Sequence, residues 1–492
     1  MKVAAAGSTP PNAPPGSTAV RPVRRVQVDD RPETYSSGSL LVRAFGPAWP
    51  LKLLLLGFPL WWALGFASFA FLIAAGAMAA QLVTRRSIHV PRGFGIWVLF
   101  LAWMLVGGFV LWAQAPGTVD GGGLERLVGF AYRAVWYLAV TVAMLYAMNL
   151  PDRQVPSIKV IRWMGFLFLT AVVGGIAGLL FPRFEFTSLA ELIVPGADSA
   201  FIYAKVHPSL STVSDFLGYE QARPKAPFTY ANAWGNNVGL LLPFFAYAVM
   251  RAERTWLRVA GVLVLLAALV PIAYSLNRGL WLGLGLLFGY GTFLLVRQRR
   301  FTAVWVAVAV LTAATVVVGI SPIGQTVTLR LETPHSNDRR TEVADVVVRT
   351  TLQGSPLVGY GTNRQVLGSF ASLAGGGSAD CRQCAAPPLG TQGFVWRLVL
   401  TTGFVGTALF GLFMLIQLLA HVRLRDPVSV LGCMTIMVSG LFFFVYDSLE
   451  SPLFMLMLAI GLMNRRNIGV TVTTLHAQSQ VETQPTLSRG TR

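Results

Sequence analysis

The chain has 492 residues, of which 54% are hydrophobic and only 12% are charged, and its formal net charge is +18. A soluble domain carries about 25% charged residues, so this composition excludes an ordinary soluble protein and predicts an all-α polytopic membrane protein. An excess of Lys and Arg is typical of cytoplasmic loops. Since the sequence contains no nucleic-acid-binding motif, we expect membrane lipids as partners and no nucleic acid.

The two ends of the chain differ from the middle. Residues 1–46 are rich in Pro, Ser and Arg and lack the apolar segment of a cleavable signal peptide, so we expect a disordered basic cytoplasmic tail. Residues 467–492 have a similar composition and predict a second disordered cytoplasmic tail. Residues 47–466 then form the transmembrane domain.

Apolar runs in this domain predict about 12 transmembrane helices, because one crossing needs roughly 20 apolar residues. The first two are short and are expected to form a hairpin. The predicted spans are Leu51–Leu64, Ser68–Val83, Gly93–Ala113, Leu127–Leu150, Val160–Phe181, Asn237–Met250, Trp256–Ser275, Gly279–Val296, Thr302–Ile320, Phe394–Ala420, Val428–Tyr446 and Pro452–Met463.

Alternate connections between these spans are basic, including RRSIHVPR at 85–92, RAERTWLR at 251–258, RQRR at 297–300 and HVRLR at 421–425. Basic loops remain on the cytoplasmic side, so both termini are predicted to be cytoplasmic. Two long loops, 182–236 and 321–393, then lie at the outer face. Long loops usually carry function or are disordered.

The first long loop ends in RPKAPFTYANAW, with Arg223, Lys225, Tyr230, Asn232 and Trp234 just before an apolar span. An interfacial aromatic belt explains the tryptophan. It does not explain a basic pair on the outer side, so we take these five residues as candidates for substrate binding.

Two further arginines lie at or within the membrane. Asn277 and Arg278 belong to YSLNRGLWLG, a polar turn between two apolar spans, and Arg133 interrupts another apolar span. Ionisable residues at such positions are functional candidates by default. The alternatives are that Arg278 reaches lipid headgroups and that Arg133 pairs with Tyr132 or a backbone carbonyl.

In the second long loop, valines at helical spacing predict a helix that begins near Ser336. Arg339 and Arg340 fall in its first turn, where cations are unfavourable unless an anion is bound. A helix N-terminus with two arginines suits an oxyanion. Alternatively, Asp338 and Glu342 neutralise the pair. The outer cationic groups together suit a phosphate or pyrophosphate anchored in the outer leaflet.

The same loop contains Cys381 and Cys384, which are candidates for a disulfide if the loop is outside the cell. We expect no metal site and no cofactor. The chain has no P-loop, and Asp447 and Glu450 are the nearest approach to a pair of acids on the outer face.

Four segments carry a family resemblance: APFTYANAWGNNVGLLLPF (226–244), SLNRGLWLGL (275–284), RRTEVADVVVRTTLQGSPLVGYG (339–361) and FVWRLVLTTGFVGTALFGLFML (394–415). In their order and outer placement they resemble the O-antigen ligase and O-antigen polymerase family of bacterial membrane proteins. The resemblance covers about 40% of the chain.

The resemblance implies a GT-C-type glycosyltransferase of surface polysaccharide biosynthesis in the bacterial plasma membrane, with its active site facing outward. The donor would be a polyprenyl-pyrophosphate-linked oligosaccharide, the acceptor a glycan or other hydroxyl, and the reaction metal-independent and inverting. Arg278 and Arg340, or its neighbour Arg339, would hold the pyrophosphate. A flippase and chain-length regulators are the implied protein partners.

The chain departs from the family's ligases at one position. Those ligases have a His-Asn pair where Gln392 and Gly393 stand here, which favours a polymerase or a diverged member. The candidates to replace the missing base are His335, His207 and Glu342.

Two other functions remain open from the sequence. A lipid-linked glycan flippase or another 12-span transporter fits the span count, but the link at Arg251–Thr255 is short and no internal repeat is seen. A non-catalytic scaffold leaves Arg278 and the Arg339–Arg340 pair unexplained.

Overall fold

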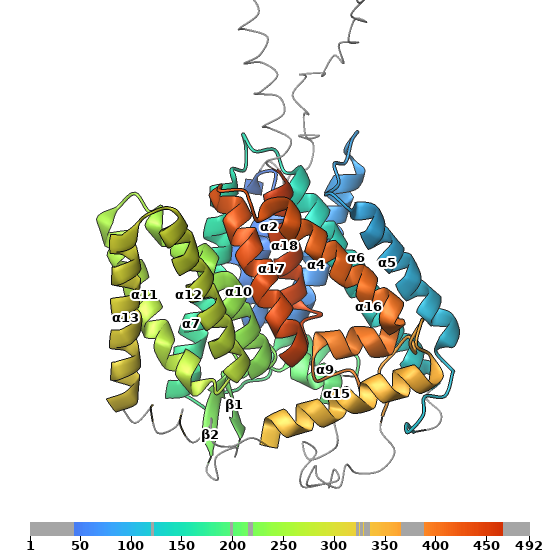
Figure 1. The fold of residues 1–492 in the computed structure, drawn as a ribbon. Helices are drawn as coiled ribbons and strands as arrows, with labels where there is room; N and C mark the ends of the chain where they lie inside the picture. Colours follow the sequence, from blue (N-terminus) through green and yellow to red (C-terminus); the bar gives the residue numbers. More distant parts are fainter. Residues whose placement is uncertain are drawn as a thin grey trace, which may run out of the picture.

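The computed structural model describes residues 44–119, 123–196, 200–214, 220–320, 324, 328, 335–365 and 388–465, with some side chains inside helices left undescribed. These residues are mostly helical (Figure 1). Within this part of the chain, six helices are long and apolar enough to cross a bilayer. They are α6 (Leu124–Asn149), α7 (Ser157–Leu180), α11 (Thr255–Tyr274), α12 (Arg278–Arg297), α16 (Phe394–His421) and α17 (Pro427–Val445).

The remaining predicted spans also coincide with helices. They are α2 (Trp49–Leu56) and α3 (Phe58–Ala63), α4 (Ala67–Val83), α5 (Phe94–Val106) with the 3₁₀ turn η1 (Gly107–Val110), α10 (Ala231–Met250), α13 (Phe301–Ile320) and α18 (Ser451–Arg465). The predicted span at Asn237–Met250 starts too late, because α10 begins at Ala231 and takes the Asn- and Trp-rich segment into its first turns.

Short elements fill the two long loops. The first loop contains α8 (Leu189–Ile193), α9 (Ala200–Val206) and an antiparallel hairpin of β1 (Ser211–Ser214) and β2 (Gln221–Pro224), with Ser211 opposite Pro224. The second contains α15 (His335–Gly354), which confirms a helix near the predicted start. Hairpin and α15 lie at the same end of the molecule (Figure 1).

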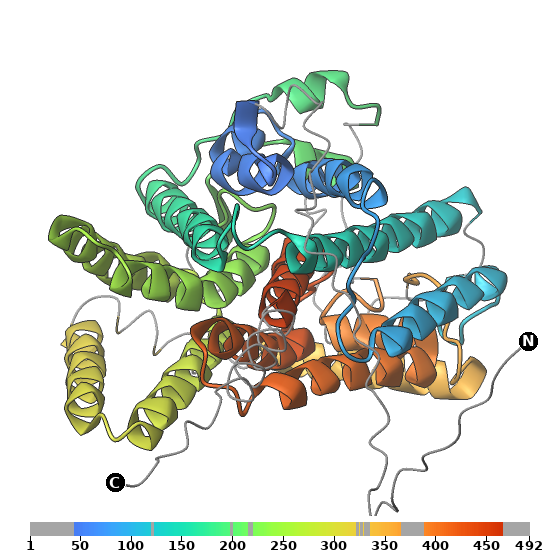
Figure 2. The same cartoon turned by 90° about the horizontal axis from the view of Figure 1, so that it is seen from above.

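Helix α18 occupies the centre of the bundle and is buried along its whole length. It packs against α6, α10 and α17, and the view from above places it inside a ring of other helices (Figure 2). An almost entirely apolar helix is stable there because every side of it is covered by protein. Its first residue, Ser451, is therefore buried inside the molecule.

Helix α16 changes direction at Gly403, whose φ of 64° and ψ of −173° are not helical. The segment after α15 fits into this bend: Gly359 and Gly361 have positive φ, and the Tyr360 and Gly361 amides donate to Leu400 and Thr401 carbonyls at 2.8 and 3.0 Å. A Cβ at Gly403 would lie 2.2 Å from the Leu357 carbonyl oxygen. Only glycine fits this position.

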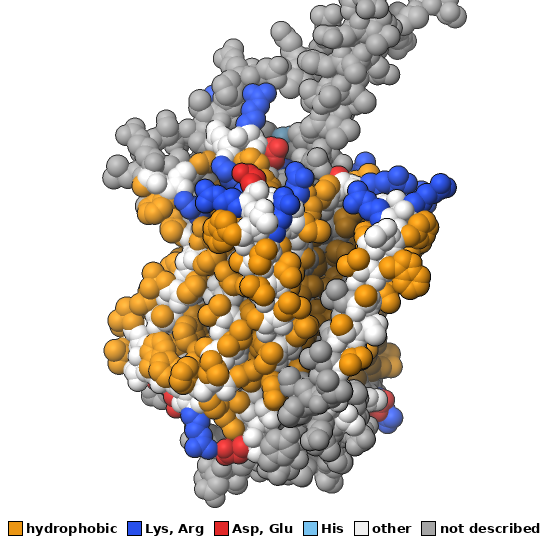
Figure 3. Space-filling model, turned by 90° about the vertical axis from the view of Figure 1, so that its left-hand side faces the viewer, with side chains coloured by type: hydrophobic (Ala, Val, Ile, Leu, Met, Phe, Trp, Pro, Cys, Tyr) orange, Lys and Arg blue, Asp and Glu red, His pale blue; other side chains and the backbone are white. Residues whose placement is uncertain are grey.

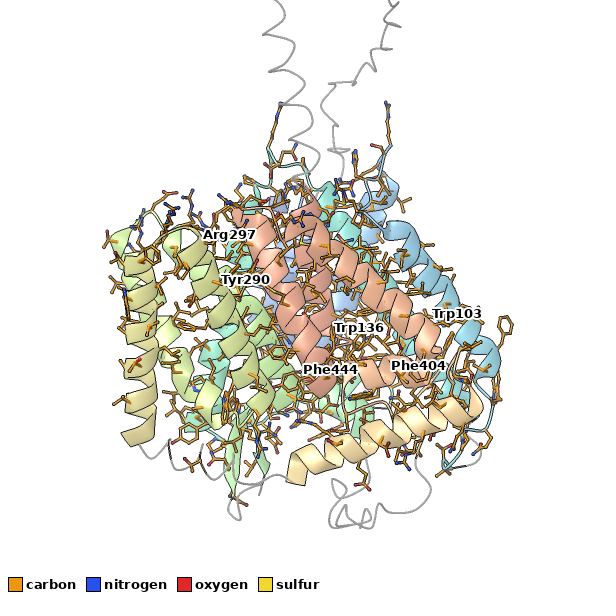
Figure 4. All side chains as sticks on the ribbon, in the orientation of Figure 1. Trp103, Trp136, Tyr290, Arg297, Phe404 and Phe444 are labelled. Carbon is orange, nitrogen blue, oxygen red and sulfur yellow. The ribbon has the colours of Figure 1, made fainter. Side chains whose placement is uncertain are left out.

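The surface divides into bands. A wide hydrophobic band covers the flank of the bundle, and Lys and Arg side chains gather along one edge of it (Figure 3). Arg297 marks this basic edge at one end of α12, whereas α15 crosses the opposite end (Figure 4). A hydrophobic belt with charged rims is the expected surface of a membrane-embedded protein.

Candidate functional site

A cavity of about 1170 Å³ opens within the part of the chain that the structure describes. Small-molecule sites usually measure roughly 300–1,000 Å³, so this space admits a ligand larger than a drug-sized molecule. Its walls come from α4, α6, α9, the β1–β2 hairpin, the start of α10, residues 362–365 and 388–397, and the α17–α18 connection. Trp136, one of its lining residues, lies near the middle of the bundle (Figure 4).

The lining combines aromatic rings with neutral hydrogen-bonding groups. The aromatic residues are Phe58, Phe69, Phe71, Tyr132, Trp136, Phe228 and Tyr230, and the amide residues are Asn232, Asn363, Gln365 and Gln392. Apolar walls with a few convergent polar groups are characteristic of ligand sites. Rings and amides together suit a ligand with apolar faces and many hydroxyl groups, such as a sugar.

One wall of the cavity carries two ion pairs, which we call the charge-paired end. Lys205 of α9 binds Glu450, and Arg397 of α16 binds Asp447. The Tyr132 hydroxyl also donates to the Glu450 carboxylate, at 2.6 Å. Burying a charge is costly unless it is paired, and these pairs explain how four charged groups lie inside an apolar bundle.

Helix α10 fixes the α17–α18 connection that holds both acids. Asn236 and Asn237, buried in its second turn, donate from their side-chain amides to the Ser448 and Ser451 hydroxyls, each at 2.8 Å. Hydrogen bonds between buried polar groups specify one arrangement. The early start of α10 therefore determines where the acids lie.

The two carboxyl groups have opposite pKa shifts. Withdrawal from bulk water raises the pKa of the Asp447 carboxyl above its ordinary value, although the Arg397 guanidinium opposes the shift. Burial also acts to raise the pKa of the Glu450 carboxyl, but the Lys205 ammonium and the Tyr132 hydroxyl outweigh it and lower the pKa. Asp447 is also the more accessible, with 38% of its side chain exposed against 28% for Glu450.

Arg223 of β2 connects this cavity to the turn before α12. Its side chain lines the cavity and donates to the Ser275 carbonyl at 2.8 Å, to the Asn277 side-chain oxygen at 2.8 Å and to that of Asn232 at 3.2 Å. Asn277 in turn donates to the Ala231 carbonyl at 2.9 Å. The first long loop, α10 and α12 are thereby joined at one point.

Arg278 and Arg340 lie close together beyond this turn and, with Arg223, form what we call the arginine cluster. Burial lowers the pKa of the Arg340 guanidinium, and Arg278 adds to the decrease by repulsion. Two of these arginines act on Tyr446: burial raises the pKa of its hydroxyl, and Arg340 and Arg223 act in the opposite direction. Its hydroxyl would lie 2.8 Å from a Cβ at Gly279, beside Arg278. Grouped arginines from three elements favour an anion.

Arg133 lines the cavity and donates to the Gly361 carbonyl at 2.7 Å. The sequence left two possibilities for Arg133, a hydrogen bond to Tyr132 or a backbone carbonyl, and a place on the wall of a polar cavity. The structure shows both a backbone-carbonyl partner and a place on the cavity wall.

The other predicted site residues differ in position. Arg223, Tyr230 and Asn232 line the cavity, whereas Trp234 does not. The Trp234 ring is fully buried and donates to the Ala171 carbonyl at 2.9 Å. Lys225 lines a small neighbouring pocket, and burial lowers the pKa of its ammonium.

Some predictions fall outside the described residues. Cys381 and Cys384, with their candidate disulfide, lie in an undescribed segment, and the side chains of His335 and Arg339 are not described although their backbones belong to α15. Gln392, which stands at the position of the family's ligase base, lines the cavity.

Sequence reasoning missed Arg397 and Lys205 and noted Asp447 and Glu450 without placing them. A signal exists for Arg397, since it is the single charged residue in the run FVWRLVLTTG. Lys205 lies in a loop whose course into the bundle has no sequence signature. The sequence as a whole matches no protein-family model and no curated protein.

Proposed function

We propose that this protein is a glycosyltransferase that transfers a glycan from a polyprenyl pyrophosphate to an acceptor hydroxyl in bacterial surface polysaccharide synthesis. The observation that carries the proposal is the convergence of Arg223, Arg278 and Arg340 beside a large aromatic and amide-lined cavity. The arginine cluster would bind the pyrophosphate, and the cavity would bind the sugars.

The chemistry follows from these positions. The acceptor oxygen attacks the anomeric carbon, and the bond from that carbon to the phosphate oxygen breaks. Guanidinium groups with two parallel donors stabilise the negative charge that develops on the leaving pyrophosphate. The reaction is expected to invert the anomeric centre and to proceed without a metal ion.

The proposed orientation places the cavity outside the plasma membrane, with about 12 spans and both termini in the cytoplasm. It is supported by the basic edge of the hydrophobic band, which lies at the end of the bundle opposite α15 and the hairpin (Figures 1 and 3). The end of a membrane protein that is rich in Lys and Arg usually faces the cytoplasm.

The test combines a deletion strain with a reconstituted reaction. Surface polysaccharide is resolved by gel in the deletion strain, and a lipid extract of that strain is supplied to the purified protein in liposomes, with and without EDTA. Loss of long chains and their regrowth in liposomes support a polymerase, and completed chains that remain on the carrier support a ligase. Translocation of the lipid-linked glycan without new glycosidic bonds would establish the flippase instead.

A further inference from the structure

We propose that Asp447 is the general base that removes the proton from the attacking acceptor hydroxyl. The inference rests on the proposed function and deepens it, because it assigns the charge-paired end of the cavity to the acceptor. Asp447 belongs to the charge-paired end and follows Tyr446, on which two residues of the arginine cluster act.

Tyr446 precedes Asp447 with extended backbone, at φ −122° and ψ 148°. Side chains of neighbouring residues in extended backbone point to opposite sides. Accordingly, the Tyr446 ring lies on the side of the arginine cluster, while the Asp447 carboxylate lines the cavity. The base would therefore act from the cavity side and the leaving group would depart on the side of the arginine cluster, and attack and departure on opposite sides suit an inverting displacement.

The other described acid of the charge-paired end is unsuited to this role. Glu450 accepts from both Lys205 and the Tyr132 hydroxyl, and these donors lower the pKa of its carboxyl. A carboxylate held by two strong donors is a weak base. Asp447 accepts from one charged donor, Arg397, and from the Leu449 backbone amide at 3.4 Å, and its carboxylate is the more accessible of the two.

The electrostatic surroundings also favour Asp447 as a base. Burial raises the pKa of its carboxyl and Glu450 adds to the increase, which strengthens its affinity for a proton. Neighbouring carboxyl groups whose pKa values are moved apart commonly divide the acid and base roles. The charged and titratable groups that act on Asp447 from the surrounding elements are Arg397 of α16, Lys205 of α9, Arg133 and Tyr137 of α6, Tyr230 before α10, and Glu450.

In the proposed step, the acceptor O–H gives its proton to an Asp447 carboxylate oxygen as the new oxygen–carbon bond forms. The electron pair of the broken carbon–oxygen bond stays on the pyrophosphate. The proton then leaves Asp447 for water through the cavity. Arg397 orients the carboxylate in this scheme and is a positioning residue.

The experiment compares wild type, Asp447→Asn and Asp447→Glu in liposomes supplied with the lipid extract of the deletion strain. Initial rates are measured from pH 4.5 to 8.5, and retention of the lipid-linked donor is measured by native mass spectrometry. We expect Asp447→Asn to bind donor but to lose roughly 100-fold or more in rate. The wild-type rate should fall as the pH drops through the raised pKa of Asp447, and this decline should be absent in Asp447→Asn.

Asp345→Asn is the matched control, because Asp345 pairs with Arg349 on the exposed face of α15. If Asp447→Asn does not fold, Asp447→Glu is the deciding variant. A lower rate, with the fall in rate at acid pH moved to a different pH, supports Asp447 as the general base. A pH–rate profile equal to that of wild type overturns this role. An active wild type with an equally active Asp447→Asn overturns this inference alone. An inactive wild type overturns the proposed function and the inference with it.

Discussion

The charge-paired end lines the cavity, and the arginine cluster reaches it through Arg223, but the charged groups of the two regions have different partners. Arg278 and Arg340 repel each other, and Arg223 donates to three neutral oxygen atoms. At the charge-paired end, Lys205 and Arg397 each bind a carboxylate directly. Grouped like charges favour an incoming anion, whereas paired charges are already neutralised.

This difference separates the tasks of the two regions. A pyrophosphate brings its own negative charge and therefore suits a region where positive charges are grouped. An acceptor sugar is recognised by hydrogen bonds and needs a proton removed, which one accessible carboxylate can do. Substitutions in the two regions should therefore impair different steps of the reaction.

The largest effect is expected from Arg278→Ala and Arg340→Ala. Each removes a group that stabilises charge in the transition state, so the initial rate of glycan transfer should fall by roughly 100- to 1000-fold. The rate of Arg340→Lys should lie between those of wild type and Arg340→Ala, because lysine keeps the positive charge but lacks the two parallel donors of arginine. Rates are measured in liposomes with the lipid extract of the deletion strain.

The matched control is Arg349→Ala on the same helix as Arg340, where the side chain is 71% exposed. It should transfer glycan at the wild-type rate. Wild-type rates from Arg278→Ala and Arg340→Ala would show that the arginine cluster takes no part in the reaction. The two regions would then not divide the binding of leaving group and acceptor.

The second prediction concerns Gly403, whose bend in α16 places Arg397 at the cavity. Gly403→Ala combines positive φ with a backbone clash at Leu357, so it should cost about 1–3 kcal/mol or more. We expect a lower thermal midpoint in detergent and loss of activity. Gly411→Ala is the control, since a Cβ there meets nothing within 4 Å. Equal midpoints for both variants would contradict the role given to the bend.

Trp234→Phe should have a smaller effect, limited to stability. It removes one buried hydrogen bond to the Ala171 carbonyl, which is worth about 1 kcal/mol. The thermal midpoint should fall while the KM for the lipid-linked donor stays the same. Trp256→Phe, at a ring that is 61% exposed, is the control. A KM that rises with Trp234→Phe would return this residue to the binding site.

The smallest effect is confined to acid pH and concerns Glu450. Because folding lowers the pKa of its carboxyl, its contribution to stability is complete above the ordinary value of about 4.3. The contribution is lost as the pH falls through the lowered pKa. Thermal midpoints measured in detergent from pH 7 to pH 3 should decline less in Glu450→Gln than in wild type. Glu253→Gln, at a side chain that is 89% exposed, should decline like wild type. Parallel curves for wild type and Glu450→Gln would show that Glu450 is not held by Lys205.

The helices were largely predictable, because apolar runs of bilayer length and the basic loops between them are properties of local sequence. Helix α16 was expected at Phe394–Ala420 and is found at Phe394–His421. The start of α10 was missed since Asn232 and Asn236 look like residues before a helix. The burial of Asn236 is made favourable by its partner Ser448 on the α17–α18 connection, and Asn232 accepts from Arg223 of the first long loop.

Composition and the pattern of apolar runs were enough to identify a helical membrane protein and to draw attention to particular arginines. The sequence pointed to Arg278 because a charge is conspicuous where hydrocarbon is expected. It pointed to Arg223 as part of a basic pair on the outer side, and to Arg340 because a cation in the first turn of a helix favours a bound anion. The tertiary structure decided that these three lie together, that Trp234 is buried away from the cavity, and that Lys205 and Arg397 each meet an acid. Those facts depend on contacts between residues up to 245 positions apart, as in Lys205 and Glu450, and no local pattern encodes such a distance.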